Sequence, residues 1–333
     1  MKTGITYSGE IVEQYHPPEK EYSPANQEIK FSEDQHAIWA ELFSGIHQPE
    51  LLAYACREFK MGLEMIDFDP KRIPTVAHLN RQIHPRTGWS IERTAVRYTT
   101  ADNWYEKFAK RIFLITDYLR TWEQLTFTPE PDMFHDIFGH LPYLTQPFYA
   151  EIEDKFAPAY LKATQEERDV IKRLAWYSTE FGLVMEDGQM KVFGAGLLSG
   201  KGELETVISE IERLRQTLFD PAQDIYPQIC EMFEANRAIV SNLIEEINLL
   251  HQKGQMSSES EGWTVVEHVY DKLGIERSGY FGGRVLIAPF DLETIAMVPK
   301  TVYAMNPIFF VAETFSTMSA LLDSFLQPIA ARA

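Results

Sequence analysis

Cysteine is scarce in this sequence, with only Cys56 and Cys230 among 333 residues. Two distant cysteines do not form a disulfide framework, which fits a protein of a reducing compartment. Neither cysteine has a catalytic motif around it, so both are expected to be buried structural thiols. The composition therefore excludes a small secreted protein held together by disulfides.

Long apolar runs are missing as well. No uninterrupted apolar stretch approaches the ~20 residues that a membrane-spanning helix needs. The N-terminal Met-Lys-Thr-Gly-Ile-Thr-Tyr lacks the apolar core of a signal peptide. We therefore expect a cytoplasmic protein with no membrane partner.

Basic residues are outnumbered, with 31 Lys and Arg against 49 Asp and Glu and a formal net charge of −18. A nucleic-acid partner requires a basic surface that neutralises phosphates, so the charge argues against DNA or RNA binding. It also disfavours an anionic membrane surface. With 45% hydrophobic and 13% aromatic residues, the chain is nevertheless able to bury a large core.

One stretch stands out, Thr128-Pro-Glu-Pro-Asp-Met-Phe-His-Asp-Ile-Phe-Gly-His140, and Glu180 follows it in a Trp-Tyr-Ser-Thr-Glu run. Two imidazoles and one carboxylate with an open opposite face form the donor set of non-haem Fe(II) oxygenases. On a regular helix, however, His135 and His140 diverge by roughly 140°. Gly139 is expected to let the backbone adjust there. The spacing alone is equally compatible with capping or core roles for both histidines.

The flanking motifs resemble the tetrahydropterin-dependent aromatic amino acid hydroxylases, the family of the phenylalanine, tyrosine and tryptophan hydroxylases. The resemblance covers most of residues 30–205 and about 288–327, in several ordered motifs. These are PEPDxxHDxxGHxP at 129–142, TEFGL at 179–183, Phe193-Gly-Ala-Gly-Leu-Leu-Ser199, Ile73-Pro, Leu79-Asn, Thr87-Gly-Trp89 and Asn306-Pro-Ile-Phe-Phe-Val-Ala-Glu313.

The resemblance implies the mainly α catalytic-domain fold of this family, or α+β with small β elements. Residues 1–30 are polar and proline-containing, and they are expected to form an extended N-terminal arm. Residues 31–333 are expected to form a single catalytic domain, with an atypical insertion at about 211–288 where the resemblance pauses. The regulatory domain of the animal enzymes and the C-terminal tetramerisation helix are expected to be absent. The oligomeric state stays open.

Local patterns predict several elements between the motifs. The predicted helices begin with a capping box at Ser32-Glu-Asp-Gln35, run from Pro49 to about Leu63, and cover 102–121, 161–181 and 206–252, the last broken near Asp220. The predicted strands lie within 87–98, at Trp263–Glu267 and at Arg284–Ile287.

By resemblance, His135, His140 and Glu180 hold Fe(II), and O2 is a co-substrate. Asp132 is compatible with two roles, because it either orients a ligating imidazole or caps the helix that carries it.

Four further residues match the amino-acid site of the family. Arg120 takes the place of the arginine that binds the substrate carboxylate, a role that suits a planar guanidinium. Thr128 and Ser199 match positions beside the substrate backbone, and Trp176 matches the residue beside the substrate ring. Judged without the family, Arg120 is compatible with a surface helix end, Thr128 with a helix cap and Trp176 with the core.

The pterin side departs from the family pattern. Trp104 lies where the family stacks an aromatic ring on the pterin, and Asp136 replaces a glutamate that is one methylene group longer. The run from Arg93 to Tyr98 replaces the loop that cradles the pterin, and Ala175 stands where the family usually has a tyrosine. The resemblance still implies tetrahydropterin as the reductant, and the residues of its site are expected to differ from those of the family.

The leading hypothesis is an Fe(II)- and tetrahydropterin-dependent monooxygenase that hydroxylates the ring of a small aromatic amino acid. Among the usual substrates, conversion of phenylalanine to tyrosine is favoured because the chain lacks a regulatory domain. One alternative is a non-haem iron oxygenase of a modified or biosynthetic aromatic substrate that uses another pterin or reductant. A second alternative is a non-catalytic metal-binding protein with the same fold.

Overall fold

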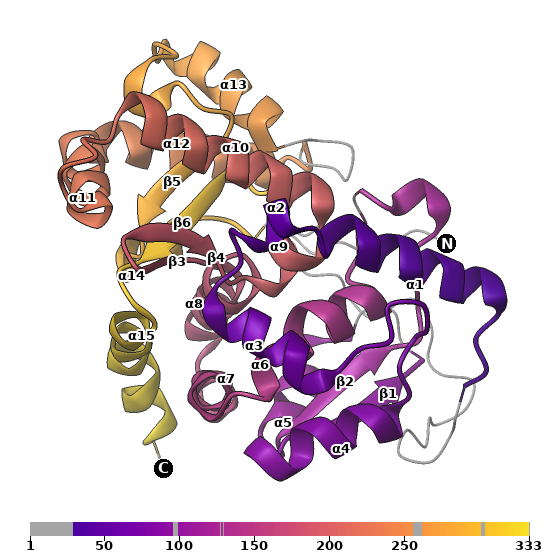
Figure 1. Ribbon diagram of the computed structural model, residues 1–333. Helices are drawn as coiled ribbons and strands as arrows, with labels where there is room; N and C mark the ends of the chain where they lie inside the picture. The colour runs from indigo at the N-terminus through magenta and orange to yellow at the C-terminus, as the bar shows by residue number, and fades with distance from the viewer. Residues whose placement is uncertain are drawn as a thin grey trace.

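Helices dominate the fold and surround two small sheets (Figure 1). The structure, a computed structural model, describes residues 29–95, 99–126, 128, 130–255, 262–300 and 304–332. The predicted mainly helical fold with small β elements is confirmed. Nearly all of the predicted arm at 1–30, and residues 96–98 of the predicted pterin loop, lie outside the described residues.

The N-terminal half contains the helices and strands that carry the two histidines. They are α1 (Glu33–Ile46), α2 (Pro49–Leu52), α3 (Arg57–Ile66), α4 (Val76–Thr87), β1 (Ser90–Thr94), α5 (Ala101–Phe108), β2 (Ile112–Thr116), the 3-10 turn η2 (Trp122–Gln124), the π-helix η3 (His135–His140), α6 (Leu141–Leu144) and α7 (Pro147–Tyr160).

The C-terminal half begins with the helix that leads to Glu180. Its elements are α8 (Gln165–Ala175), the π-helix η4 (Trp176–Glu180), β3 (Leu183–Glu186), β4 (Gln189–Val192), α9 (Ala195–Ser199), α10 (Lys201–Thr217), α11 (Ile225–Ala235), α12 (Arg237–Gln252), α13 (Gly262–Leu273), the 3-10 turn η5 (Gly279–Phe281), β5 (Leu286–Pro289), α14 (Leu292–Met297), β6 (Ile308–Ala312) and α15 (Phe315–Ala330).

Each half contains one sheet. Strands β1 and β2 pair in parallel from Ser90 opposite Ile112 to Thr94 opposite Thr116. The second sheet has the order β4-β3-β6-β5, in which only the β3–β4 pair is antiparallel. All residues of β5 and β6 are buried, as expected for parallel strands covered on both faces. Helix α11 packs against β5 on one side of this sheet (Figure 1).

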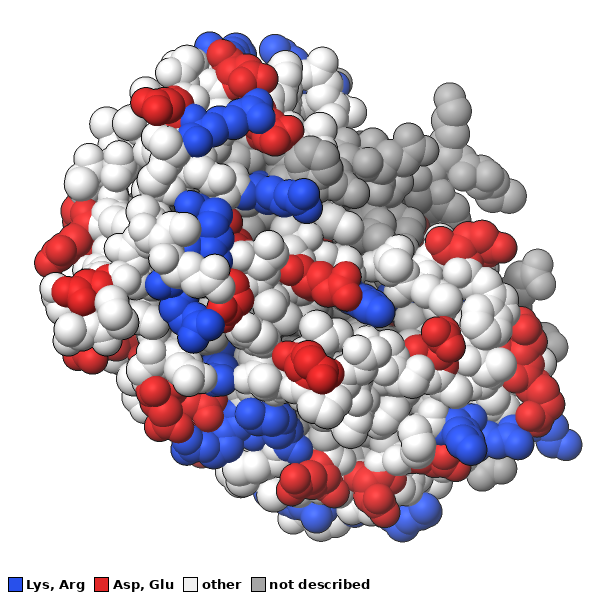
Figure 2. Space-filling model, turned by 45° about the horizontal axis from the view of Figure 1, so that its top comes forward, with Lys and Arg blue, Asp and Glu red and all other residues white. Residues whose placement is uncertain are grey.

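One hydrophobic cluster runs through the described residues from Ile38 to Ile329. It includes buried side chains from α10 to α13, so most of the segment predicted as an insertion shares the core of the rest of the chain. None of the helices in the described part of the chain is long and apolar enough to span a membrane. On the face shown in Figure 2, Lys and Arg side chains stand among Asp and Glu side chains.

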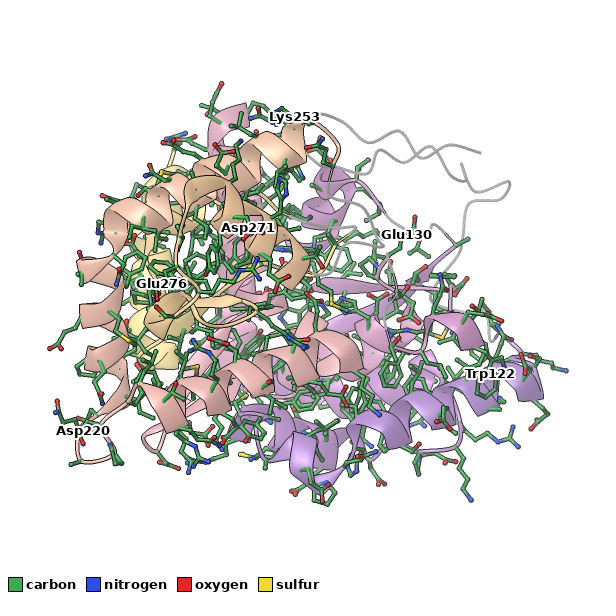
Figure 3. All side chains as sticks on the ribbon, turned by 90° about the horizontal axis from the view of Figure 1, so that it is seen from above. Trp122, Glu130, Asp220, Lys253, Asp271 and Glu276 are labelled. Carbon is green, nitrogen blue, oxygen red and sulfur yellow. The ribbon has the colours of Figure 1, made fainter. Side chains whose placement is uncertain are left out.

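Several local predictions are confirmed. The Ser32 hydroxyl accepts the backbone N–H of Gln35, whose side chain accepts the N–H of Ser32 in return, so the capping box begins α1. The helices over 206–252 break where expected, because α10 ends at Thr217 and Asp220 lies in the turn before α11 (Figure 3). The predicted strands in 87–98 and 284–287 correspond to β1 and, with a later start and end, to β5.

The predicted helix over 102–121 is wrong in its second half. Helix α5 ends at Phe108, the chain turns at Arg111 with φ +53°, and Ile112–Thr116 is β2. The run Ile-Phe-Leu-Ile-Thr is apolar and partly β-branched, and its last four residues are buried. Such a run suits a buried parallel strand, which periodicity alone does not separate from a helix.

Two other predicted elements are also corrected. The helix from Pro49 is interrupted after α2, because the Cys56 N–H donates to the carbonyl of Val192 instead of continuing the helix. The run from Trp263 to Glu267 belongs to α13 and is not a strand. The apolar residues of this segment recur at helical spacing, and those on the inner face are buried, namely Val265, Val266, Val269 and Tyr270.

The helix predicted over 161–181 is confirmed from Gln165 onward. Thr164 caps it through the N–H of Glu167, and its last turn widens into the π-helix η4. A similar π-helix, η3, resolves the five-residue spacing of His135 and His140, because i→i+5 bonding brings residues five apart towards one face.

The two cysteines differ in burial, and both are free thiols. Cys56 is fully buried 3.3 Å from the Tyr143 hydroxyl, and burial raises its pKa to about 12. The prediction of a buried structural thiol is therefore confirmed for Cys56. It is wrong for Cys230, which is only partly buried because it lies on the outer helix α11.

Position 139 requires glycine because another backbone segment lies against it, and not because its backbone adopts a conformation that only glycine allows. A Cβ at this position would lie 2.6 Å from the carbonyl oxygen of Ala195, where η3 packs on α9. We predict that Gly139→Ala destabilises the protein by about 1–3 kcal/mol, because the backbone of α9 has to move. Urea unfolding measures the change.

The control for this substitution is Gly45→Ala on α1. A Cβ there meets only the Lys201 side chain at 3.9 Å, so stability is expected to stay constant or to rise by up to about 1 kcal/mol. Equal stability of the Gly139 variant and the wild type would contradict the packing argument.

Candidate active site

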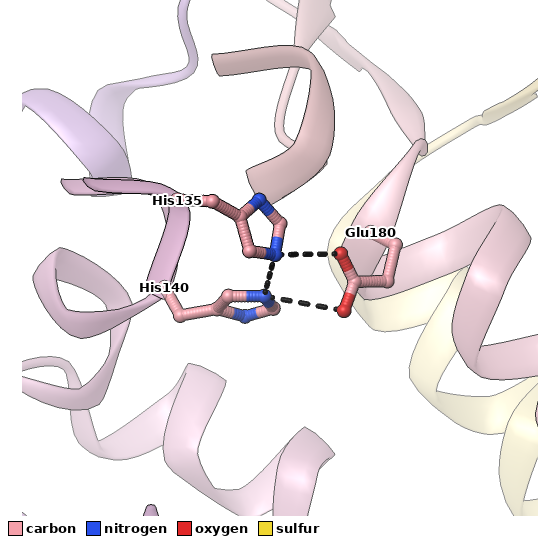
Figure 4. Close-up of side chains that lie close together, drawn as sticks. All are labelled: His135, His140 and Glu180. Atoms are coloured by element: carbon pink, nitrogen blue, oxygen red, sulfur yellow. Dashed lines mark hydrogen bonds and ion pairs between the residues drawn. The ribbon is translucent and has the colours of Figure 1, made fainter. Parts of the chain in front are cut away.

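His135, His140 and Glu180 meet at one point in the interior (Figure 4). The Nε2 atoms of the two histidines are 3.2 Å apart. Glu180 places Oε2 3.5 Å from His135 Nε2 and Oε1 3.2 Å from His140 Nε2. The donor atoms of the three residues all lie within 4.8 Å of one another, so one metal ion can contact all three.

A hydrogen bond from α9 sets the tautomer of His135. The Ser199 hydroxyl donates to the carbonyl of Ala195 at 2.8 Å, which leaves its oxygen as an acceptor. His135 Nδ1 lies 2.8 Å from that oxygen and therefore carries the proton. The Nε2 lone pair then points at the other two donors, as a metal ligand requires.

The electrostatics of the three residues favour one positive charge beside Glu180. Burial lowers the pKa of His135 to about 4. Burial also acts against charge on His140, but the adjacent Glu180 carboxylate outweighs it and raises the pKa of His140. Burial opposes the charge of Glu180, but the facing imidazoles of His140 and His135 lower its pKa to about 2. A bound cation would supply that positive charge in place of a proton.

Two cavities adjoin this donor set. The smaller has a volume of about 60 Å³ and the larger about 340 Å³. His135, Trp176 and Glu180 line both of them. The structure thus brings all nine predicted site residues to the walls of these two cavities.

The smaller cavity contains the four residues predicted from the amino-acid site, namely Arg120, Thr128, Trp176 and Ser199. Arg120 is 1% exposed, so it is not a surface helix-end arginine. Its guanidinium makes two hydrogen bonds to Asp132, of 2.9 and 2.7 Å, and a longer one to the carbonyl of Ser199. This buried pair holds the guanidinium at the cavity wall.

Asp132 takes one of its two predicted roles, that of a capping residue. Its Oδ1 accepts the backbone N–H of His135 at 3.0 Å, as a capping residue does. It orients Arg120 and does not contact the His135 ring, whose partner is Ser199. Burial acts against its charge, but Arg120 outweighs that effect and lowers the pKa of Asp132.

Thr128 and Trp176 are also held by specific partners. The Thr128 hydroxyl donates to the carbonyl of Glu130 at 2.9 Å, so it stabilises a turn and does not cap a helix. The indole N–H of Trp176 donates to Asn306 Oδ1 at 2.8 Å. Asn306 in turn donates its backbone N–H and its side-chain amide to Glu203.

The larger cavity contains the two residues predicted from the pterin site. Trp104 packs edge-on against Phe113, whose ring centroid is 5.1 Å from that of His140. Asp136 is buried, and its Oδ2 accepts the backbone N–H of Thr116 at 2.8 Å. Burial raises the pKa of Asp136 to about 8. Ala175 also lines this cavity.

Sequence reasoning missed Glu153, a buried carboxyl in the wall of the larger cavity. A signal was present, because Glu153 follows Tyr149 and Ile152 and precedes Phe156 in the buried register of α7. An acidic residue on the apolar face of a helix indicates a polar environment inside the protein. Lys300 was missed as well, and its Nζ lies 4.8 Å from the centroid of the Trp176 ring.

Comparison with known proteins agrees with this geometry. A family model described as biopterin-dependent aromatic amino acid hydroxylase matches residues 16–242. The chain belongs to this family. The family and the enzyme class predicted from the motifs are thereby confirmed, and the match extends into the segment predicted as an insertion.

Bacterial relatives of this hydroxylase carry a more specific name. The phenylalanine-4-hydroxylase of Vibrio cholerae is 30% identical over 230 residues, which cover 65% of this chain and 79% of that protein. The phenylalanine-4-hydroxylase of Pseudomonas aeruginosa is 30% identical over 232 residues, 66% of this chain and 87% of that protein. That of Chromobacterium violaceum is 38% identical over 177 residues, 52% of this chain and 58% of that protein.

Solved structures share the fold. The Chromobacterium violaceum phenylalanine hydroxylase with bound oxidised Fe(III) has a TM-score of 0.64 at 24% identity, covering 90% of this chain and 83% of that one. A structure of the same protein with iron(III) and the oxidised cofactor 7,8-dihydrobiopterin has a TM-score of 0.62 at 25% identity, covering 91% and 85%.

The buried carboxyl of Glu203 is expected to make the stability of the protein depend on pH. Burial raises its pKa to about 7 from an ordinary 4.5, although Asn306 donates to the carboxylate. Between these values the unfolded chain has released the proton that the folded protein still holds, so stability falls as pH rises from about 4.5 to about 7. At about 1.4 kcal/mol per pKa unit, the loss amounts to at most about 3.5 kcal/mol.

Glu203→Gln is expected to remove this part of the pH dependence, measured by urea unfolding of the metal-free protein at pH 5 and pH 8. Glu205→Gln changes an exposed carboxylate on the same helix, α10, and should follow the wild type. If the Glu203 and Glu205 variants show the same pH dependence, the carboxyl of Glu203 ionises normally in the folded protein.

Proposed function

We propose that this protein is an Fe(II)- and tetrahydropterin-dependent monooxygenase that converts phenylalanine to tyrosine. The observation that carries the proposal is the meeting of His135, His140 and Glu180 between two cavities. The substrate is supported by the bacterial relatives, which are named phenylalanine-4-hydroxylases. A cytoplasmic location and a single catalytic domain over 31–333 remain predictions.

The donor set fits Fe(II). Two neutral imidazoles and one carboxylate are the ligands of the facial triad, which leaves positions open on the other side of the metal. The Glu180 side chain retains 23% exposure, and both cavities reach it. We therefore propose His135, His140 and Glu180 as the iron ligands, with the open positions facing the two cavities.

The smaller cavity suits the amino-acid substrate. Arg120 presents a guanidinium that pairs with a carboxylate, and Asp132 keeps it in place. We propose that Thr128 and Ser199 contact the substrate backbone and that Trp176, fixed through its N–H by Asn306, packs against the ring.

The larger cavity suits the pterin. Its volume of about 340 Å³ lies within the range of ligand pockets, and its wall combines aromatic rings with buried carboxyl groups. We propose that Trp104 packs against the planar pterin ring and that Asp136 contributes to the polar part of the site. Bound together, Fe(II) and tetrahydropterin supply the electrons with which O2 yields one oxygen atom for the aromatic ring.

The deciding experiment supplies Fe(II)-loaded protein with a tetrahydropterin, O2 and phenylalanine, tyrosine or tryptophan in separate reactions. Formation of tyrosine from phenylalanine, coupled to pterin oxidation, is the expected result. If tyrosine or tryptophan is hydroxylated instead, with pterin oxidation, the proposed enzyme class is correct and phenylalanine is the wrong substrate. Bound iron without turnover of any of the three would refute the proposal and favour the alternative of an unusual substrate or reductant.

Glu180→Gln tests the metal site directly. The substitution keeps the shape of the side chain but removes the charge that faces both imidazoles, so Fe(II) affinity is expected to fall by more than about 100-fold. Iron content after dialysis against a graded chelator measures the loss. Glu151→Gln on α7, an exposed carboxylate, serves as the control and should retain iron.

A further inference from the structure

Glu153 is a buried acid for which the proposed reaction has no assigned role. Its side chain is 5% exposed and lies in the wall of the larger cavity, on the same face of α7 as Phe156 and Tyr160. Among the described residues, none forms a hydrogen bond or ion pair with its carboxyl group. A buried carboxyl without a partner is costly, which indicates that a ligand in the cavity completes its hydrogen bonds.

Asp136, another carboxyl in the cavity wall, is already engaged. Asp136 accepts the backbone N–H of Thr116, which ties its short side chain to the end of β2. Glu153 has no such partner among the described residues, so its carboxyl remains available to a ligand in the cavity.

The charged groups around Glu153 argue for a ligand that donates hydrogen bonds rather than for an anion. His140, Glu180 and Asp154 act on its charge, and two of these three are carboxylates. Among the cations in the cavity wall, Arg168 is paired with Asp102 at 3.0 Å and Lys172 with Asp169 at 2.7 Å, while Lys300 Nζ lies 4.8 Å from the centroid of the Trp176 ring. Burial raises the pKa of Glu153 to about 8, and a hydrogen-bond donor beside the carboxyl would favour its charged form.

We propose that Glu153 binds the N3–H and 2-amino edge of the reduced pterin. This aminopyrimidinone edge presents two adjacent N–H donors, and a carboxylate accepts both side by side. Glu153 is therefore a specificity-determining residue for the reductant. The inference rests on the proposed function, because it assumes a pterin in the larger cavity.

The test compares two ligands by anaerobic titration calorimetry on the Fe(II)-loaded protein. One is 6-methyltetrahydropterin, and the other is the corresponding tetrahydrolumazine, in which a carbonyl replaces the 2-amino group. The carboxylate of Glu153 would face an acceptor in the lumazine. The wild type is thus expected to bind the pterin about 10- to 100-fold more tightly, the range for losing a hydrogen bond to a charged group.

Glu153→Gln should weaken pterin binding by a similar factor and reduce the preference over lumazine to a few-fold, with iron content unchanged. Glu151→Gln, on the exposed face of the same helix, should match the wild type in both affinities. Loss of iron in the Glu153 variant would overturn the proposal, since it would assign Glu153 to the support of His140. Unchanged pterin affinity in a folded variant would overturn it as well.

The wild-type comparison decides the matter even if the variant does not fold. Equal affinity of the wild type for pterin and lumazine overturns the role of Glu153 and leaves the proposed function standing if the pterin still supports turnover. Failure of the iron-loaded wild type to bind any tetrahydropterin overturns both the role of Glu153 and the proposed reductant.

Discussion

The close contact of α9 with two π-helices positions the whole site. One π-helix, η3, carries His135 and His140, and the other, η4, ends at Glu180. The backbone at the start of α9 lies against both of them. A Cβ on Gly139 would meet the Ala195 carbonyl at 2.6 Å, and a Cβ on Gly194 would meet the Glu180 carbonyl at 2.4 Å. Backbone packed this tightly leaves the three donor side chains little freedom to separate.

The same short helix also sets the chemistry of one ligand. Ser199, at the end of α9, holds the proton of His135 on Nδ1, and the Ser199 carbonyl accepts from Arg120. Arg120 is in turn paired with Asp132, which caps η3 through the N–H of His135. The proposed metal ligands and the proposed carboxylate-binding arginine therefore belong to one buried hydrogen-bond network. Such a network holds its side chains in fixed positions, because a buried polar group that loses its hydrogen-bond partner reduces the stability of the folded protein.

The two cavities differ in a way that matches two different ligands. The smaller is built around a buried guanidinium, whereas the larger has aromatic walls and two buried acids. His135, Trp176 and Glu180 line both, so molecules bound on the two sides would meet at the donor set. Asp136, Ala175 and Glu153 all line the larger cavity.

The sequence by itself determined the donor set, the family and nine of the residues that line the two cavities, because ordered motifs such as PEPDxxHDxxGHxP carry their spacing with them. It also determined the first helix, since the Ser32 capping box is a local interaction. Only the tertiary structure decided that Ile112–Thr116 is a strand and that 262–273 is a helix, because pairing with β1 and packing against α12 are contacts between distant residues. It likewise decided that five-residue spacing is accommodated by a π-helix, and that Glu153 faces a cavity, since both depend on how α7, α9 and η3 pack together.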